Sequence, residues 1–134
     1  MRDVCSRCNG RLSSKTFTAH PKIDPRTGEV VAYGYNTQGV ASSTIELFFI
    51  EPDGTLARTE RFDAPYASMV HDFMLSENYV VFTICPMICD WERVKAGKPF
   101  FHWDGSLPTK VAVIPRRRTL SVPKNCFRRW AKCP

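Results

Sequence analysis

The feature that most constrains this chain is a series of short runs rich in Val, Ile, Phe, Tyr and Thr, several of which alternate in character. Turn signals separate them, namely DPRTGE, EPDGT and SEN. No stretch sustains a helical period over about ten residues. We therefore predict an all-β chain of hairpins and meanders, as in a propeller, sandwich or barrel. The predicted strands are residues 15–21, 29–36, 44–51, 56–63, 69–75, 78–84 and 110–115.

One short helix is predicted outside this pattern, within residues 87–97 (MICDWERVKAG). Asp90 is a candidate N-cap, and Gly97 follows the basic residues Arg93 and Lys95 at the other end. These signals allow at most about two helical turns, inside a loop.

Both ends of the chain differ in composition and periodicity from the strand-rich part, residues 15–118. Residues 1–14 are polar and have no period, so we predict an irregular N-terminus. Residues 119–134 have no clear strand period either and are predicted to be a basic, irregular tail. With 134 residues, the chain is long enough to bury the core of one ordinary domain.

The net charge of +6 comes from the C-terminal end of the chain. From Arg116 onward there are basic residues and no acidic ones. Such a tail can bind phosphate groups, but the chain lacks a motif for reading bases. We therefore predict no nucleic-acid partner.

The apolar runs are too short for a membrane span. None approaches the ~20 residues that cross a bilayer as a helix. The first ten residues, MRDVCSRCNG, lack the apolar core of a secretory signal. We therefore predict no transmembrane segment and a cytoplasmic location.

Six cysteines suggest a different type of site. Cys5 and Cys8 form a CxxC, which is half of a zinc site or a redox pair. A structural zinc site needs a second pair of similar spacing. Neither remaining pair has that spacing, so we favour reduced thiols. A small zinc-binding or nucleic-acid-binding protein stays as an alternative. The remaining cysteines are Cys85, Cys89, Cys126 and Cys133.

Two of the three histidines, His20 and His71, lie in predicted strands with apolar neighbours. They are 51 residues apart, close to the ~40–50 residues of one propeller blade. Equivalent positions on successive inner strands would both face a central axis, where neutral imidazole could bind a metal. Pro21 also marks a strand end. Alternatively, each histidine is a core residue that satisfies its hydrogen bonds locally. His102 is expected to be a surface or loop residue.

Three sequence blocks resemble one known family. They are TAHPKIDPRTGEV (18–30), VHDFMLSENYVVF (70–82) and FHWDGSLPTKVAVIPRR (101–117). In this order they resemble signatures of the carotenoid oxygenases, and the resemblance spans roughly residues 10–118. The sequences of these blocks are most similar to those of the lignostilbene-cleaving and resveratrol-cleaving branch.

The resemblance implies a seven-bladed β-propeller, of which this chain would form about two blades. Four histidines of such a protein hold Fe(2+) on the axis, and His20 and His71 match the first two. The implied enzyme is an oxidoreductase, a dioxygenase that cleaves a carbon–carbon double bond in carotenoids, apocarotenoids or stilbenes. No histidine follows His102, so we expect the other ligands in missing blades of the same polypeptide, and we expect this chain alone to be catalytically dead or marginal.

The resemblance also suggests roles for other residues. Phe73 is expected to pack in the core on the same side as His71, with Asp72 on the opposite side. Arg116 is expected to hold a neighbouring loop by hydrogen bonds. The turn residues are expected to be Asp24, Thr27, Gly28, Glu77 and Asn78. The alternative to a dioxygenase is a non-catalytic all-β interaction module whose histidines are structural.

Overall fold

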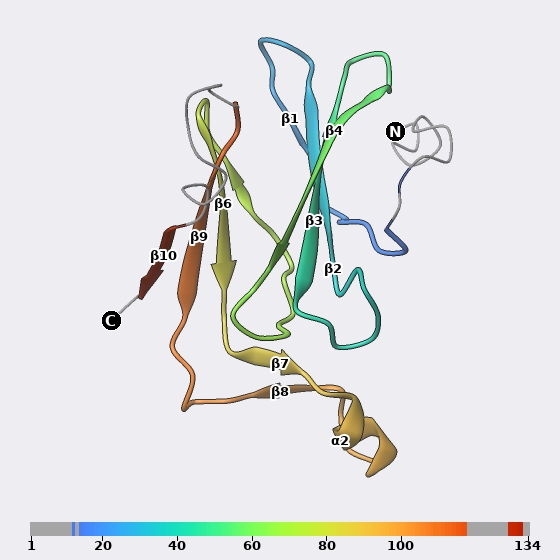
Figure 1. The fold of residues 1–134 in the computed structure, drawn as a ribbon, viewed down its shortest axis with the longest axis vertical. Coiled ribbons are helices and arrows are strands. Elements are labelled where there is room, and N and C mark those ends of the chain that lie inside the picture. Colours follow the sequence, from blue (N-terminus) through green and yellow to red (C-terminus); the bar gives the residue numbers. More distant parts are fainter. Residues whose placement is uncertain (1–11, 13, 118–128, 133–134) are drawn as a thin grey trace. The chain divides into compact units, whose positions relative to one another are not determined.

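The computed structural model describes residues 12, 14–117 and 129–132, and these form strands and one short helix (Figure 1). The all-β prediction is confirmed. The described residues fall into two compact units that divide between Ala64 and Pro65. The elements are β1 (Lys22–Ile23), β2 (Val30–Tyr35), β3 (Thr44–Ile50), β4 (Leu56–Asp63), β5 (Met74–Leu75), β6 (Tyr79–Ile84), β7 (Met87–Cys89), α2 (Trp91–Lys95), β8 (Phe101–Trp103), β9 (Lys110–Pro115) and β10 (Arg129–Lys132).

The first unit is an antiparallel meander in which β1, β2, β3 and β4 follow one another across one sheet. Every residue of β3 is buried, whereas β4 mostly alternates between exposed and half-buried residues. Ala32, Phe48 and Ile50 form a buried cluster, against which Leu12, Phe17, Val30 and Leu56 pack. The Phe17 ring stacks on Phe48 at 6.0 Å between centroids. This cluster lies on one face of β2 and β3, and the residues of the opposite face, among them Val31, Leu47 and Phe49, are buried as well.

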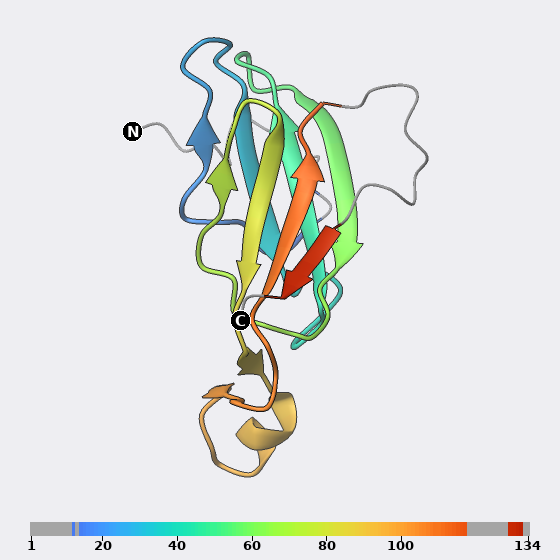
Figure 2. The same ribbon diagram turned by 90° about the vertical axis from the view of Figure 1, so that its left-hand side faces the viewer.

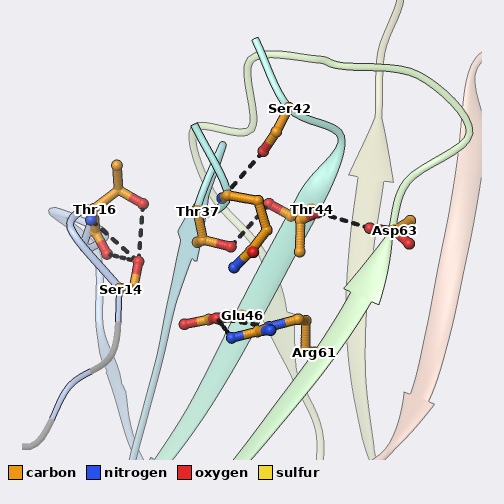
Figure 3. A network of polar contacts seen from close by, with 9 residues as sticks. Ser14, Thr16, Thr37, Ser42, Thr44, Glu46, Arg61 and Asp63 are labelled. Atoms are coloured by element: carbon orange, nitrogen blue, oxygen red, sulfur yellow. Dashed lines mark hydrogen bonds and ion pairs between the residues drawn. The ribbon is translucent and has the colours of Figure 1, made fainter. Parts of the chain in front are cut away.

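Two polar pairs join β3 to β4 (Figure 3). The Arg61 Nε atom donates to Glu46 Oε1 at 2.8 Å, and the Glu46 side chain is buried. The Thr44 hydroxyl donates to Asp63 Oδ1 at 2.7 Å. Within each pair, the two residues lie directly opposite each other in the β3–β4 ladder. A slip of one residue would send these side chains to opposite faces, so the pairs help to fix the register.

The chain before β1 passes very close to β2 at Gly34. A Cβ atom at Gly34 would lie 2.7 Å from Thr16 Oγ1 and 2.8 Å from Ser14 Oγ, and closer still to the Thr16 carbonyl oxygen. Neither side chain can easily move. The Thr16 hydroxyl donates to the Tyr35 carbonyl at 2.7 Å. The Ser14 hydroxyl donates to the Thr16 carbonyl at 2.8 Å (Figure 3). Position 34 thus requires a residue without a side chain.

Gly34→Ala is expected to lower the free energy of unfolding by about 1–3 kcal/mol, because the added methyl group displaces residues 14–16. Gly105→Ala is the matched control, since its nearest neighbour would be Trp103 Nε1 at 3.8 Å. Urea denaturation of both variants measures the difference. Equal denaturation midpoints for the two variants would contradict the close approach at Gly34.

The second unit contains a sheet in the order β10, β9, β6, β5. Between β6 and β9 the chain leaves this sheet to form the β7–β8 hairpin, with α2 at its far end (Figures 1 and 2). The core of this unit is made by fully buried residues of β6 and β9, namely Val80, Phe82, Ile84, Ala112 and Ile114. The two meanders therefore have the same form, apart from the hairpin inserted in the second.

The predicted helix is confirmed at its centre. The Asp90 carboxylate accepts from the backbone N–H groups of Glu92 at 2.9 Å and Arg93 at 3.3 Å, and Gly97 follows the helix with φ +70°. The first residues of the predicted segment form β7 instead, because Ile88 pairs with His102 across the hairpin. This long-range pairing outweighs the local helical signals.

Five predicted strands are confirmed within one residue at each end, as β2, β3, β4, β6 and β9. The other two, residues 15–21 and 69–75, were predicted wrongly. Residues 15–21 form no strand, and only the last two residues of the second segment do, as β5. In both segments the backbone ladder is interrupted, as described below.

The predicted irregular tail, residues 119–134, contains a strand. Residues Arg129–Lys132 form β10, which pairs with β9. The physical reason is that the second edge of β9 offers unpaired N–H and C=O groups. Residues 1–11 lie outside the described part, so the predictions for Cys5 and Cys8 are not examined by the structure. The domain boundaries stay predictions.

Candidate metal centre

His20 lies immediately before β1 and outside any strand. Its side chain is exposed, and its backbone N–H donates to the Thr18 hydroxyl at 3.0 Å. The Thr18 N–H in turn donates to the Tyr33 carbonyl at 2.7 Å, which ties the segment to β2. Pro21 lacks an N–H, and β1 begins at the next residue. The histidine is thus presented from a short irregular segment that is anchored on both sides.

His71 lies in a similar setting, within residues 70–73 before β5. The side chains of Val70 and Phe73 are buried, whereas those of His71 and Asp72 are exposed. The Phe73 ring stacks on Phe82 at 5.5 Å between centroids, with an interplanar angle of 20°. Two buried apolar side chains therefore anchor the backbone on either side of His71.

This geometry corrects part of the sequence prediction. Both histidines were predicted inside strands, but both precede one. Phe73 was predicted on the same side as His71 and opposite Asp72, whereas His71 and Asp72 are both exposed. The alternation fails because residues 70–73 do not form a strand. The expected core packing of Phe73 is confirmed.

The two histidines occupy equivalent places in their own sheets. Each precedes, by two or three residues, the two-residue first strand of a four-stranded meander. Among the described strands, β1 and β5 each pair with one neighbour and lie at an edge of their sheets (Figure 2). The expectation that His20 and His71 hold corresponding positions in two successive structural repeats therefore agrees with the topology of each unit.

Imidazole nitrogen is a suitable donor for a ferrous ion, so the residue type at both positions fits an iron site. Within the described residues, no group of three or more His, Cys, Asp or Glu side chains could hold a metal ion. Each described unit presents one exposed imidazole, that of His20 in the first and that of His71 in the second.

His102 differs from the other two histidines. It lies on β8 opposite Ile88, not in a loop as predicted, because β7 and β8 pair over this stretch. Its side chain is half-buried, and its Nδ1 atom is buried without a hydrogen-bond partner among the described residues. Its neighbour in the hairpin, Asp104, has its pKa lowered, mainly by hydrogen bonds from Ser106. Nothing in this environment presents His102 as a ligand.

The predicted supporting residues are confirmed. Arg116 is buried, donates from Nη1 to the Ser76 carbonyl at 3.3 Å, and donates from its backbone N–H to the Asn78 carbonyl at 2.8 Å. It thereby holds the turn between β5 and β6. At the earlier turn, the Gly28 N–H donates to the Asp24 carbonyl at 2.8 Å, and Gly28 has φ +74°.

The hydrogen bonds of two hydroxyl groups in the segment before His71, those of Tyr66 and Ser68, were not anticipated from the sequence. The Tyr66 hydroxyl lies within hydrogen-bond distance of two carbonyl oxygens, at 2.9 Å from Ile84 and 2.7 Å from Pro108. Burial raises the pKa of Tyr66 above its ordinary value. The buried Ser68 donates to the Cys85 carbonyl at 2.5 Å. The sequence feature that could have indicated such hydroxyl groups is a Ser or Thr residue two or three positions before each histidine, Thr18 before His20 and Ser68 before His71.

Comparison with known proteins identifies the family. A sequence model described as retinal pigment epithelial membrane protein matches residues 3–134. Carotenoid cleavage oxygenase 1 of Neurospora crassa is 45% identical over 109 residues, which cover 81% of this chain and 21% of that protein. The chain belongs to the carotenoid oxygenase family. The matched region extends beyond residues 10–118, where the resemblance was expected.

Other relatives in the carotenoid oxygenase family agree. Lignostilbene-alpha,beta-dioxygenase isozyme III of Sphingomonas paucimobilis is 40% identical over 126 residues, which cover 94% of this chain and 25% of that protein. The crystal structure of a Pseudomonas brassicacearum lignostilbene dioxygenase matches with a TM-score of 0.83 and 44% identity, over 94% of this chain and 25% of that one. The chain thus spans about a quarter of the length of these relatives.

The structural match also settles the fold class. Carotenoid oxygenases are β-propellers, and the two four-stranded meanders described here are a fragment of that architecture. The helix in the described residues is too short and too polar to cross a bilayer.

Proposed function

We propose that this chain is part of an iron(II)-dependent dioxygenase that cleaves a carbon–carbon double bond, and that His20 and His71 are two of its iron ligands. The observation that supports the ligands most directly is their equivalent position, each just before the first strand of its meander. The names of the relatives, carotenoid cleavage oxygenase and lignostilbene dioxygenase, support a small apolar polyene or stilbene as the substrate.

The proposed iron would supply the activation of dioxygen for cleavage of the double bond into two carbonyl products. This chain would contribute two exposed imidazoles on anchored backbone. Burial of Val70 and Phe73 limits the movement of His71, and the bonds of Thr18 limit that of His20. Such restraint matters because metal affinity depends on holding ligands in a fixed geometry. The remaining ligands and the substrate-contacting residues would come from further blades of the same polypeptide.

The experiment that tests this proposal is a segment exchange. The chain replaces the segment that it matches in the Pseudomonas brassicacearum lignostilbene dioxygenase, which is 44% identical to it. We call the product the grafted enzyme. It is expected to bind iron in a stoichiometric amount and to cleave a lignostilbene into two aldehydes, measured by metal analysis and chromatography.

The 134-residue chain purified alone is the comparison. It is expected to bind iron weakly and to leave the substrate intact, because two imidazoles hold iron less tightly than a complete ligand set. A folded grafted enzyme that contains no iron would contradict the proposal. Cleavage by the 134-residue chain alone would contradict the need for further blades. The cytoplasmic location predicted from the sequence stays a prediction.

A further inference from the structure

His71 lies opposite an irregularity in the backbone ladder. Ser68 forms a bridge with Ile88, and the next paired residues are Met74 and Val81. Between these pairs, residues 69–73 face residues 82–87, so the partner side carries one residue more. No paired residues are found between these two points, so the ladder is interrupted over the segment that contains His71. The extra stretch contains Pro86, which has no N–H to donate to the ladder.

The Ser68 side chain closes this interruption. Its hydroxyl is buried and donates to the carbonyl of Cys85, the residue before Pro86, at 2.5 Å. On the same side, the Met69 N–H donates to the Met87 carbonyl at 2.9 Å. These bonds fix the backbone just before Val70 and His71. Ser68 therefore connects the partner stretch between β6 and β7 to the segment that carries the histidine.

The first unit has a comparable arrangement at His20. Lys22 pairs with Val31, and the preceding backbone bond joins the Thr18 N–H to the Tyr33 carbonyl. Residues 19–21 therefore face Ala32 alone, so the extra residues here lie on the histidine side. The Thr18 hydroxyl accepts a bond from the His20 N–H at 3.0 Å. In both units a hydroxyl side chain shortly before the histidine stabilises the interruption.

We propose that Ser68 and Thr18 are positioning residues for the two histidines. This inference rests on the proposed function, because it concerns how His71 and His20 would be held as ligands. Neither hydroxyl reaches a reacting atom. Each supplies a hydrogen bond that the interrupted ladder cannot, and so restricts the direction in which the histidine leaves the backbone. Loss of the hydroxyl is expected to loosen the ligand and leave the fold in place.

Tyr66 provides the matched control for Ser68. Its hydroxyl lies within hydrogen-bond distance of the carbonyls of Ile84 and Pro108, at the two points where the β7–β8 hairpin leaves the sheet. Tyr66→Phe removes hydrogen bonds to neighbouring backbone, as Ser68→Ala does. However, Tyr66 itself precedes the Ser68–Ile88 bridge, so it does not border residues 69–73, although one of its two acceptors, Ile84, lies in the partner stretch 82–87. A merely structural role for Ser68 predicts the same behaviour for both variants.

The test measures iron release and backbone opening. In the grafted enzyme, Ser68→Ala is expected to speed iron loss to a chelator by about tenfold, the lower end of the effect of groups that support a ligand. Ser68→Thr, which keeps a hydroxyl, is expected to restore slow release, and Tyr66→Phe to leave it unchanged. Thr18→Val and Thr18→Ser form the corresponding pair for His20.

The second measurement uses the metal-free 134-residue chain. Amide hydrogen exchange at residues 70–73 is expected to accelerate by about tenfold in Ser68→Ala but not in Tyr66→Phe, because Ser68, unlike Tyr66, borders this segment and ties it to the Cys85 carbonyl. Equal exchange in these two variants would overturn the inference, even if the grafted enzyme did not fold.

The variant His71→Ala separates the two proposals. If His71→Ala retains iron, both the proposed ligand and its positioning residue are wrong. If His71→Ala loses iron while Ser68→Ala releases it at the unmodified rate, the proposed function stands and the positioning role is overturned. Faster release from Ser68→Ala alone, with rescue by Ser68→Thr, supports the inference.

Discussion

Replacing His71 with alanine is expected to remove iron from the grafted enzyme and abolish cleavage of a lignostilbene, and His20→Ala is expected to do the same. Loss of a group that only supports a ligand costs about 10–100-fold in metal affinity. Loss of the ligand itself should reduce metal affinity by more than the upper end of that range. Iron per polypeptide, measured after dialysis against a weak chelator, reports the effect independently of turnover.

His102→Ala is the control for these substitutions. His102 lies on β8, and its buried Nδ1 has no hydrogen-bond partner among the described residues, so an apolar side chain there breaks no bond to that atom. The variant should keep its iron. Equal iron loss from His102→Ala and His71→Ala would point to general damage and against a specific ligand.

The same substitutions also distinguish a dioxygenase from a module with structural histidines. Both imidazoles are exposed in the 134-residue chain, so His20→Ala and His71→Ala should change its free energy of unfolding by no more than about 0.5 kcal/mol. Structural histidines would give the reverse outcome, with lower stability and unchanged iron content.

The sequence predicts the central strands well because their local signals agree with their environment. β3 is an almost continuous apolar run and is buried along its whole length. β4 alternates in character and lies half-exposed on one side of the sheet. Glycine and aspartate mark the turn between these strands, where the Gly54 N–H donates to the Glu51 carbonyl at 2.9 Å.

The two segments that carry histidines could not be predicted in the same way. Alternation of apolar and polar residues predicts a strand only where the backbone ladder is continuous. Both ladders are interrupted next to a proline. For His20 it is Pro21, in the same segment, and for His71 it is Pro86, on the partner side. The proline in the partner strand is distant in sequence from His71, so inspection of residues 69–75 alone does not reveal it. Family resemblance identified the histidines, whereas only the structure reveals how each is presented.

Strands that depend on distant partners were also missed. Residues 87–89 become β7 because β8 pairs with them, and α2 lies between the two strands. Residues 129–132 become β10 because β9 offers an edge. In neither segment do apolar and polar residues alternate over a stretch long enough to distinguish a strand from a loop. Backbone pairing with β8 or β9 therefore decides the conformation.

Phe82→Ala is expected to have the largest effect on stability, lowering the free energy of unfolding by about 3–5 kcal/mol. Phe82 is fully buried on β6, opposite Ala112 of β9, and its ring stacks on Phe73. Removal of the ring creates a cavity between the sheet and the segment that carries His71. Urea denaturation of the 134-residue chain measures the loss.

Tyr79→Ala is the matched control, because Tyr79 begins the same strand and is 48% exposed. Loss of the Tyr79 side chain should lower the free energy of unfolding by less than about 1 kcal/mol. The Phe82 cavity also removes the support of Phe73, so amide exchange at residues 70–73 should accelerate more than exchange in β9. Uniform acceleration across the second unit would mean that Phe82 stabilises the whole sheet and has no particular effect on the backbone around His71. Preferential acceleration at residues 70–73 would connect the core of the sheet directly to the placement of the proposed ligand.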